Sequence, residues 1–267
     1  AVTMNSGVTR NNGTTTTINA SHSLALRATY TNNGTTTVNG TLQIDGSGYA
    51  NGTTNISYAA TGSYLVFNSG TGPYGITAGQ RFWPGAGNIP ENVRVNTGTN
   101  VNLNDGTKLI PASGTLLLYG GFQNANASGL TLNGTLNISP NGYFSINSPN
   151  YGAASKLWYN TNSTYGNGLE WTSAANPANV QLSNNTVLNY PTNTGARTLT
   201  GNLTIDAGSA LYMDYGSPFP GAGLLTVGGN LVMNGNMSLG NNAGGDLAVK
   251  GNWTKGATAA FNPNGRL

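Results

Sequence analysis

Apolar and polar residues alternate in short segments along the whole chain, and most of these segments end in glycine or asparagine. Three segments of this type, Gly201–Ile205, Gly223–Val227 and Gly245–Val249, follow one another at an equal spacing of about 22 residues. A period of two is the pattern of a β-strand with one buried face. Gly and Asn tolerate the positive φ that tight corners need. The pattern therefore predicts short strands joined by tight turns.

A longer repeat contains this short one. Thr37–Ile44 returns as Thr131–Ile138 and again as Thr226–Met233, at a nearly constant offset of about 94 residues. The chain holds a little under three copies of a unit of about 93 residues, and their predicted limits are 1–109, 110–204 and 205–267. Because the last copy is incomplete, we expect the chain to be part of a longer protein.

A unit of about 22 residues cannot bury its apolar row alone, but stacked copies can share one continuous core. We therefore predict an all-β protein that forms a single parallel β-helix (β-solenoid), with turns of about 22 residues. Tandem β-sandwiches are the alternative, because a unit of about 93 residues is also the size of an immunoglobulin-like domain. Asn at one position in successive turns would form hydrogen bonds along the stack.

The equal spacing of the short segments also predicts a register. Leu203, Leu225 and Leu247 should form one inward row in three successive turns, with neighbouring Cα atoms roughly 5 Å apart. Leu225→Asp would then place an unpaired carboxylate between two apolar neighbours and destabilise the fold by several kcal/mol. A structure in which Leu225 does not contact both of the other leucines would contradict this register and the argument for a β-helix that depends on it.

Two segments rich in Gly, Pro and Asn, residues 68–91 and 160–178, interrupt the short repeat at equivalent places. We expect them to be loops inserted between turns, on one face of the solenoid. They contain five aromatic candidates for contact with a ligand or another surface: Tyr74, Phe82, Trp83, Tyr165 and Trp171. The alternative is that these rings fold back and cover the side of the stack, since large aromatic side chains more often pack than bind.

The composition supports an all-β fold. Asn (41), Gly (40), Thr (35) and Ser (19) make up half of the 267 residues, while charged residues are 6%, against about 25% in an ordinary soluble domain. With 13 Tyr, 6 Phe and 4 Trp the chain is not of disordered type. Its ten Lys and Arg residues do not cluster, so we expect no nucleic-acid partner. No apolar run approaches the ~20 residues of a membrane span, so we expect no membrane insertion.

The search for catalytic residues finds little. There is no Cys and a single His, His22, so the sequence has neither an imidazole–thiolate pair nor a multi-histidine metal site. His22 lies in a strand context and is expected to be an outward polar residue. Asp206 and Asp214 could approach each other like a glycosidase pair, although Asp206 aligns with corner positions of the other copies. We predict a protein that is not an enzyme and needs no cofactor or metal.

Most of the chain resembles a known group of proteins, and the motifs that show the resemblance best lie in its last third. Gly201–Met213, Leu225–Gly235 and Gly251–Thr254, followed by Phe261–Gly265, are similar to repeats of large secreted proteins of Bacteroidetes. The resemblance implies an exported, extracellular protein of adhesin type, and a type IX secretion sorting domain elsewhere in the full-length protein. The expected function is a non-enzymatic structural or adhesive repeat module of a surface or fibre protein. Its expected partners are further copies of itself, end to end or laterally, or surface glycans. A carbohydrate-binding module and a polysaccharide-degrading β-helix enzyme are the alternatives.

Overall fold

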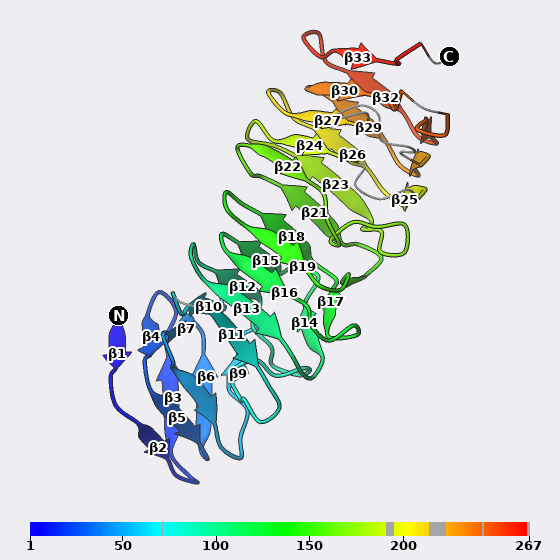
Figure 1. The fold of residues 1–267 in the computed structure, drawn as a ribbon. Helices are drawn as coiled ribbons and strands as arrows, with labels where there is room; N and C mark the ends of the chain where they lie inside the picture. Colours follow the sequence, from blue (N-terminus) through cyan, green and yellow to red (C-terminus); the bar gives the residue numbers. More distant parts are fainter. Residues whose placement is uncertain (71, 191–194, 214–222, 242, 266–267) are drawn as a thin grey trace. The chain divides into compact units, whose positions relative to one another are not determined.

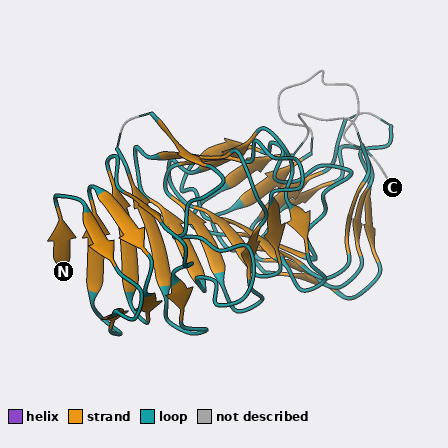
Figure 2. Ribbon diagram, turned by 90° about the horizontal axis from the view of Figure 1, so that it is seen from below, coloured by secondary structure: helices purple, strands orange, loops and turns teal. Residues whose placement is uncertain are grey.

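A computed structural model describes residues 1–70, 72–190, 195–213, 223–241 and 243–265. Within these ranges the chain contains strands and turns but no helix (Figures 1 and 2). The strands stack in parallel as a β-solenoid of about 11 turns, roughly 22 residues apart. This confirms the predicted fold class. Tandem sandwiches are ruled out, because a β-sandwich of immunoglobulin type is built from antiparallel strands.

Contacts divide the chain into two compact units, each described separately below. The first contains Ala1–Thr135 and Asn141–Asn150, and the second contains Leu136–Pro140 and Tyr151–Leu267. Two strands contain residues of both units: β18 (Thr135–Ile138) and β20 (Asn150–Tyr151). The limits of the three long copies stay a prediction from the sequence.

The first unit contains one long sheet and several short ones. In spatial order its long sheet consists of β1 (Val2–Met4), β4 (Ser23–Leu26), β7 (Thr41–Asp45), β10 (Tyr64–Asn68), β12 (Asn92–Val95) and β15 (Thr115–Leu118). The first turns also form two short sheets. One consists of β2 (Val8–Arg10), β5 (Thr29–Asn32) and β8 (Tyr49–Asn51). The other consists of β3 (Thr15–Ile18), β6 (Thr35–Val38) and β9 (Ser57–Tyr58). Later turns contain β11 (Pro73–Ile76), β13 (Asn100–Leu103), β16 (Gly121–Gln123) and β19 (Tyr143–Ser145), and the pair β14 (Lys108–Ile110) and β17 (Leu130–Leu132).

The second unit repeats this arrangement. Its part of the long sheet runs from β18 through β21 (Lys156–Tyr159), β23 (Asn179–Leu182), β26 (Leu203–Ile205), β29 (Leu231–Met233) and β32 (Trp253–Lys255). A second sheet contains β22 (Thr164–Gly166), β24 (Val187–Asn189), β27 (Ala210–Tyr212), β30 (Asn236–Ser238) and β33 (Phe261–Asn262). A third contains β25 (Arg197–Leu199), β28 (Leu225–Val227) and β31 (Leu247–Val249).

Alternation along each strand separates the core from the surface. In the first unit Leu42, Leu65, Val93 and Leu116 are register partners in four successive strands of the long sheet, and each is at most 1% exposed. On these strands the next residues in the sequence, such as Gln43, Arg94 and Leu117, are partly exposed and point to the outer face. Each turn thus contributes one apolar side chain to a continuous inward row, as a solenoid requires.

The predicted register is only partly correct. Leu225 pairs with Leu247 as predicted. Leu203, however, lies in the long sheet, where it pairs with Val180 on one side and Leu231 on the other. The register partner of Leu225 on its other side is Arg197. The single row through Leu203 is therefore wrong, because similar Gly-x-Leu-x-Ile/Val motifs occur on two different sheets. The parallel β-helix itself is established by the strand pairing and does not depend on that row.

Asparagine ladders along the stack are confirmed. In the second unit the backbone N–H of Asn202 donates to Oδ1 of Asn179 (2.9 Å), that of Asn230 to Oδ1 of Asn202 (2.8 Å), and that of Asn252 to Oδ1 of Asn230 (2.9 Å). Each Asn directly precedes a long-sheet strand or, for Asn179, begins one. The side-chain amide of one turn therefore satisfies a corner N–H of the next turn, which helps to explain the high Asn content.

Candidate functional site

The first inserted loop buries most of its predicted contact residues. Phe82 and Trp83 are both 0% exposed, whereas Tyr74 is partly exposed. Phe67 of β10 packs against both buried rings, with centroids 5.8 Å from Phe82 and 6.2 Å from Trp83. The prediction of a ligand platform is therefore corrected for Phe82 and Trp83, because rings that face the core cannot stack on an external ligand.

The second loop buries Trp171 in the same way. Trp171 is 0% exposed, and its ring contacts Tyr190 edge-on at a centroid distance of 5.3 Å. Trp171 is therefore also not available for contact with an external ligand. Phe82, Trp83 and Trp171 all pack against the solenoid, as the alternative interpretation expected. Tyr165 is partly exposed and lies 5.5 Å from the ring of Tyr159. For Tyr74 and Tyr165 a ligand contact stays a prediction.

Two buried side chains anchor the backbone of the first loop. The Tyr58 hydroxyl donates to the carbonyl of Phe82 (2.5 Å), and Lys108 Nζ donates to the carbonyl of Trp83 (2.5 Å). Burial lowers the pKa of Lys108, while the nearby Asp105 opposes that shift. Burial raises the pKa of Tyr58, so its hydroxyl keeps its proton and remains a donor.

The second loop has the same two anchors one repeat later. The Tyr151 hydroxyl donates to the carbonyl of Glu170 (2.7 Å), and Arg197 Nε donates to the carbonyl of Trp171 (3.1 Å). The dipeptide that ends in tryptophan is thus held by a tyrosine and a cation in both loops. In each loop both carbonyl groups accept hydrogen bonds from side chains of the solenoid. Hydrogen bonds therefore fix the path of each loop together with ring packing.

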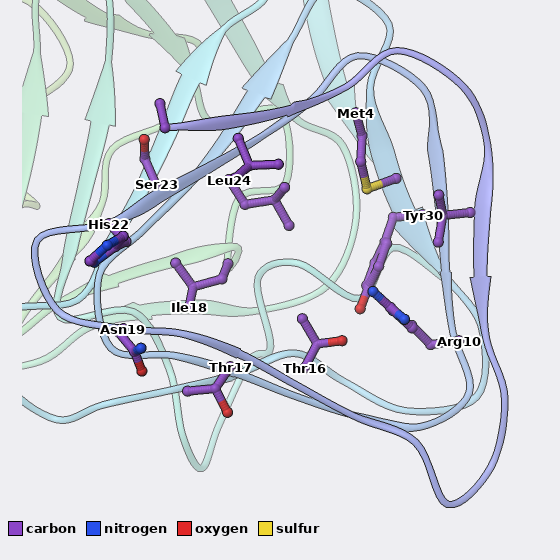
Figure 3. A pocket seen from close by; sticks show the side chains of 13 residues that line it. Met4, Arg10, Thr16, Thr17, Ile18, Asn19, His22, Ser23, Leu24 and Tyr30 are labelled. Atoms are coloured by element: carbon purple, nitrogen blue, oxygen red, sulfur yellow. The ribbon is translucent and has the colours of Figure 1, made fainter.

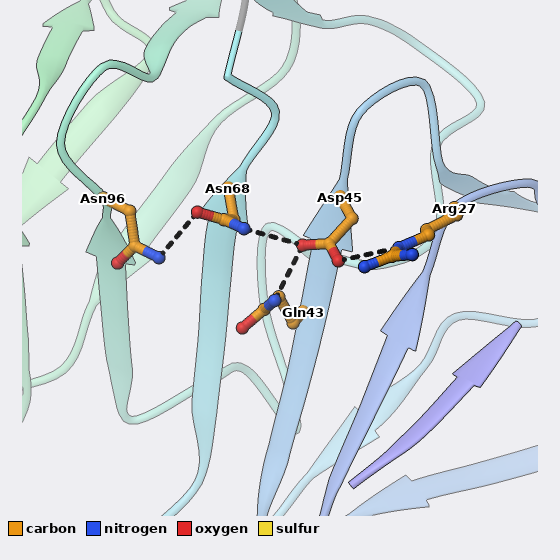
Figure 4. A network of polar contacts seen from close by, with 5 residues as sticks. All are labelled: Arg27, Gln43, Asp45, Asn68 and Asn96. Atoms are coloured by element: carbon orange, nitrogen blue, oxygen red, sulfur yellow. Dashed lines mark hydrogen bonds and ion pairs between the residues drawn. The ribbon is translucent and has the colours of Figure 1, made fainter.

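A strip of polar side chains lies on the outer face of the long sheet in the first unit (Figure 4). The Asp45 carboxylate is its centre, and this residue is 7% exposed. It accepts from Arg27 Nε (3.2 Å), Gln43 Nε2 (2.7 Å) and Asn68 Nδ2 (3.0 Å). Asn96 Nδ2 then donates to Asn68 Oδ1 (3.0 Å). These side chains come from four successive turns, so the strip crosses the strands.

A shallow pocket adjoins one end of this strip. It is lined by Asn68, Arg94, Asn96, Thr97 and Tyr119. Nε of Arg94 is buried and makes no hydrogen bond to the part of the chain that the structure describes. A guanidinium beside a phenol ring and two amides is a set of groups that can bind a carboxylate together with hydroxyl groups.

No local sequence motif indicates the strip, because Asp45, Asn68 and Asn96 each lie about one turn apart in the sequence. An alignment of the chain turn by turn would have placed Asp45, Asn68 and Asn96 at one position, just after an apolar strand.

The first turn of the described chain has an apolar edge. Within the described part of the chain, β1, β2 and β3 each pair with one strand only. Val2 is the register partner of Leu24 in the inward row, yet it is 65% exposed. A pocket at this edge is lined by Val2, Met4, Val8, Ile18, Leu24 and Tyr30 among others (Figure 3). The apolar interior is therefore accessible at this edge.

The last turn shows the same feature. Trp253 of β32 is the register partner of Leu231 in the inward row and is 44% exposed. Its ring packs edge-on against Phe261 of β33, with centroids 4.8 Å apart. Two aromatic side chains thus occupy the last inward positions of the second unit.

The histidine and the carboxylates show no catalytic arrangement in the described part of the chain. His22 is exposed at the rim of the first-turn pocket, and its Nδ1 lies 3.0 Å from the Ala20 carbonyl oxygen. Asp206 accepts from Gln181 Nε2 (2.6 Å), while Asp214 lies outside the described residues. In the described ranges no three His, Cys, Asp or Glu side chains come together as a metal site would need.

Comparisons with protein-family models, with curated proteins and with solved structures find no match to this chain. Among the residues that the structure describes there is also no helix that could span a membrane.

Proposed function

We propose that this chain is a non-enzymatic structural module of an extracellular bacterial surface or fibre protein, and that copies of it stack end to end. The open first turn is the observation that supports this proposal most directly. Val2 holds an inward position but is 65% exposed, beside an apolar pocket and three strands that each pair with only one strand in the described ranges. Free edges and uncovered apolar rows are the features through which β-sheets add further strands.

The backbone of β1 is oriented for such an addition. The carbonyl of Met4 accepts from the N–H of Arg27, which follows β4. In a parallel pair, alternate residues direct both backbone groups to the same neighbour. Val2 and Met4 therefore face β4, and Thr3 directs its N–H and C=O away from it. A parallel strand of another molecule can pair with Thr3.

The proposed occupant is the last turn of a second copy. There Trp253 holds the inward position that would continue the row of Val2. Contact between the last turn of one copy and the first turn of the next is heterologous, and a heterologous contact that does not close into a ring generates a filament. An extracellular location is proposed from the resemblance of the repeats and from an outer surface that depends on amides and hydroxyls more than on charge.

Sedimentation velocity over a range of concentrations and negative-stain electron microscopy test the assembly. We expect the wild type to form end-to-end assemblies, and Val2→Lys and Thr3→Pro to stay monomeric with an unchanged circular dichroism spectrum. Tyr64→Lys is the matched control, because Tyr64 is 37% exposed but lies on β10, away from the free edge. A wild type that stays monomeric at high concentration, or edge variants that assemble like it, would refute the proposal.

The pocket beside Arg94 favours a second function, the binding of an acidic glycan. The guanidinium would pair with the carboxylate of a uronic acid, and the Tyr119 ring and the amides of Asn68 and Asn96 would contact the sugar. A glycan array with neutral and uronic-acid polymers tests this function. Binding of acidic polymers should be lost in Arg94→Gln and kept in Lys250→Gln, which removes an equal charge from an exposed residue in the second unit. An equal loss of binding in both variants would indicate only non-specific electrostatic attraction.

A further inference from the structure

The two inserted loops differ at one interior position. Phe82 and Glu170 both precede the buried tryptophan, and both carbonyls accept from an anchoring tyrosine. In the first loop the Phe82 ring meets Phe67 edge-on at 5.8 Å. In the second loop Tyr159 takes the place of Phe67 in the repeat, and its hydroxyl donates to Oε1 of Glu170 (2.9 Å). An apolar ring pair has thus been replaced by a hydrogen-bonded carboxyl group.

The carboxyl group of Glu170 is unevenly satisfied. The residue is 0% exposed. Oε1 accepts from the Gly168 N–H (2.8 Å) as well as from Tyr159. Oε2 is buried and has no hydrogen-bond partner in the described part of the chain. A proton on Oε2 avoids an unsolvated negative charge there, so this geometry favours the neutral acid.

One cation and several phenols surround this group. Arg197 is 1% exposed, its Nε is used by the Trp171 carbonyl, and its Nη1 and Nη2 make no hydrogen bond within the described ranges. The guanidinium lies 4.5 Å from the centroid of the Tyr190 ring. The titratable groups that interact with Glu170 are Tyr151 from β20, Tyr159 from β21 and Arg197 from β25. Tyr165 of β22 lies beside Tyr159, and Tyr190 after β24 lies beside Arg197.

Tyr151, Tyr159 and Tyr190 stay neutral near pH 7. Burial raises the pKa values of Tyr151 and Tyr159 well above their usual range, and it raises the pKa of Tyr190 to about 12 against the opposing charge of Arg197. Only the carboxyl group of Glu170 changes its charge in this range. Burial raises the pKa of Glu170 to about 7, against the opposing effects of its hydrogen bonds and of Arg197.

We propose that Glu170 is a pH-sensitive latch of the second inserted loop. In its neutral form it holds residues 166–176 against Tyr159 and the solenoid core, and ionisation releases this segment so that water can reach the carboxylate. The latch is confined to the second unit, because the first loop has Phe82 at this position.

The direction of the pH effect on loop closure follows from proton linkage. The folded protein holds the Glu170 proton more tightly than an opened loop, in which the pKa returns to the ordinary value of 4.5. The stabilisation is therefore complete below about pH 4.5 and is lost as the pH rises through about 7. Between about pH 5.5 and about pH 8.5, the ratio of open to closed loop should rise by tenfold or more, on the order set by this shift.

Amide hydrogen exchange of peptides that cover residues 166–176 tests the latch, after correction for the intrinsic effect of pH. Residues 79–87 of the first loop are the internal control, and their protection should not change by this factor. Glu170→Gln should abolish the pH dependence with the fold intact. Glu170→Phe combined with Tyr159→Phe, which restores the ring pair of the first loop, should also abolish it. A wild type without the pH dependence, or a dependence that persists in Glu170→Gln, would overturn the proposal.

Discussion

A buried carboxylate should have different consequences at Leu203 and at Leu225, although the two leucines lie in similar sequence motifs. Leu203 is stacked between Val180 and Leu231, and all three are at most 1% exposed. Leu225 is stacked between Leu247 and the buried Arg197. We compare Asp with Asn at each position, because the two side chains have the same shape and differ in charge.

The expected loss of stability at Leu203 follows from its apolar neighbours. Replacing a buried leucine by either residue costs about 2–5 kcal/mol of lost packing, which is common to both variants. An Asp there has no partner for its charge and is protonated instead, which costs at most about 4 kcal/mol at pH 7 for an ordinary pKa of about 3.9. Leu203→Asp should therefore be less stable than Leu203→Asn by about 2–4 kcal/mol.

At Leu225 the difference in stability between the Asp and Asn variants should be smaller. The guanidinium of Arg197 has two nitrogen atoms, Nη1 and Nη2, without a hydrogen-bond partner in the described ranges. A neighbouring carboxylate offsets the cost of that buried charge. Leu225→Asp should therefore be within about 1 kcal/mol of Leu225→Asn, and addition of Arg197→Met should restore the larger difference.

Urea unfolding followed by tryptophan fluorescence measures these differences at pH 7 and again near pH 4, where the unpaired carboxyl group of folded Leu203→Asp is neutral. The gap between Asp and Asn at Leu203 should close at the lower pH. An equally large gap at Leu225 and at Leu203 at pH 7 would show that Arg197 does not lie beside Leu225. It would thereby refute the register of β25 and β28.

Three further predictions concern the fold and its surface. Far-ultraviolet circular dichroism should show a β-rich protein, and a helix content above about a fifth would contradict the structure. Asn202→Ala should cost about 1 kcal/mol in thermal or urea unfolding, since it removes the acceptor of the Asn230 N–H. His22→Ala should change stability by less than about 0.5 kcal/mol and leave assembly and any binding activity intact, because His22 is exposed; a loss of activity in the folded variant would contradict the non-enzymatic function.

The fold class could be predicted because its causes are local. Alternating strands such as Leu225–Val227 and corners rich in Gly and Asn follow directly from residue types, and their repetition indicates a shared core. The place of Leu203 could not be predicted in the same way. Its motif resembles that of Leu225, and only the pairing of whole strands separates the two sheets.

The candidate sites were less predictable than the fold. The positions of the inserted loops could be read from the interruption of the repeat, but the burial of Trp83 and Trp171 depends on anchors in later turns, Lys108 and Arg197. The residues of the polar strip around Asp45 are likewise far apart in the sequence, since they come from successive turns. A solenoid brings residues together one turn apart, so its sites have no contiguous sequence signal.

The comparison of the two loops explains how one interior position can change without loss of the loop structure. In both loops the backbone around the tryptophan is fixed by a tyrosine hydroxyl and a buried cation, Lys108 or Arg197. The side chain that precedes the tryptophan makes neither of these bonds. It can therefore be an apolar ring or a carboxyl group while the anchors hold the same path. Under the proposed latch, this exchange and that of Phe67 for Tyr159 opposite it would together make the second loop respond to pH, while the first loop would not.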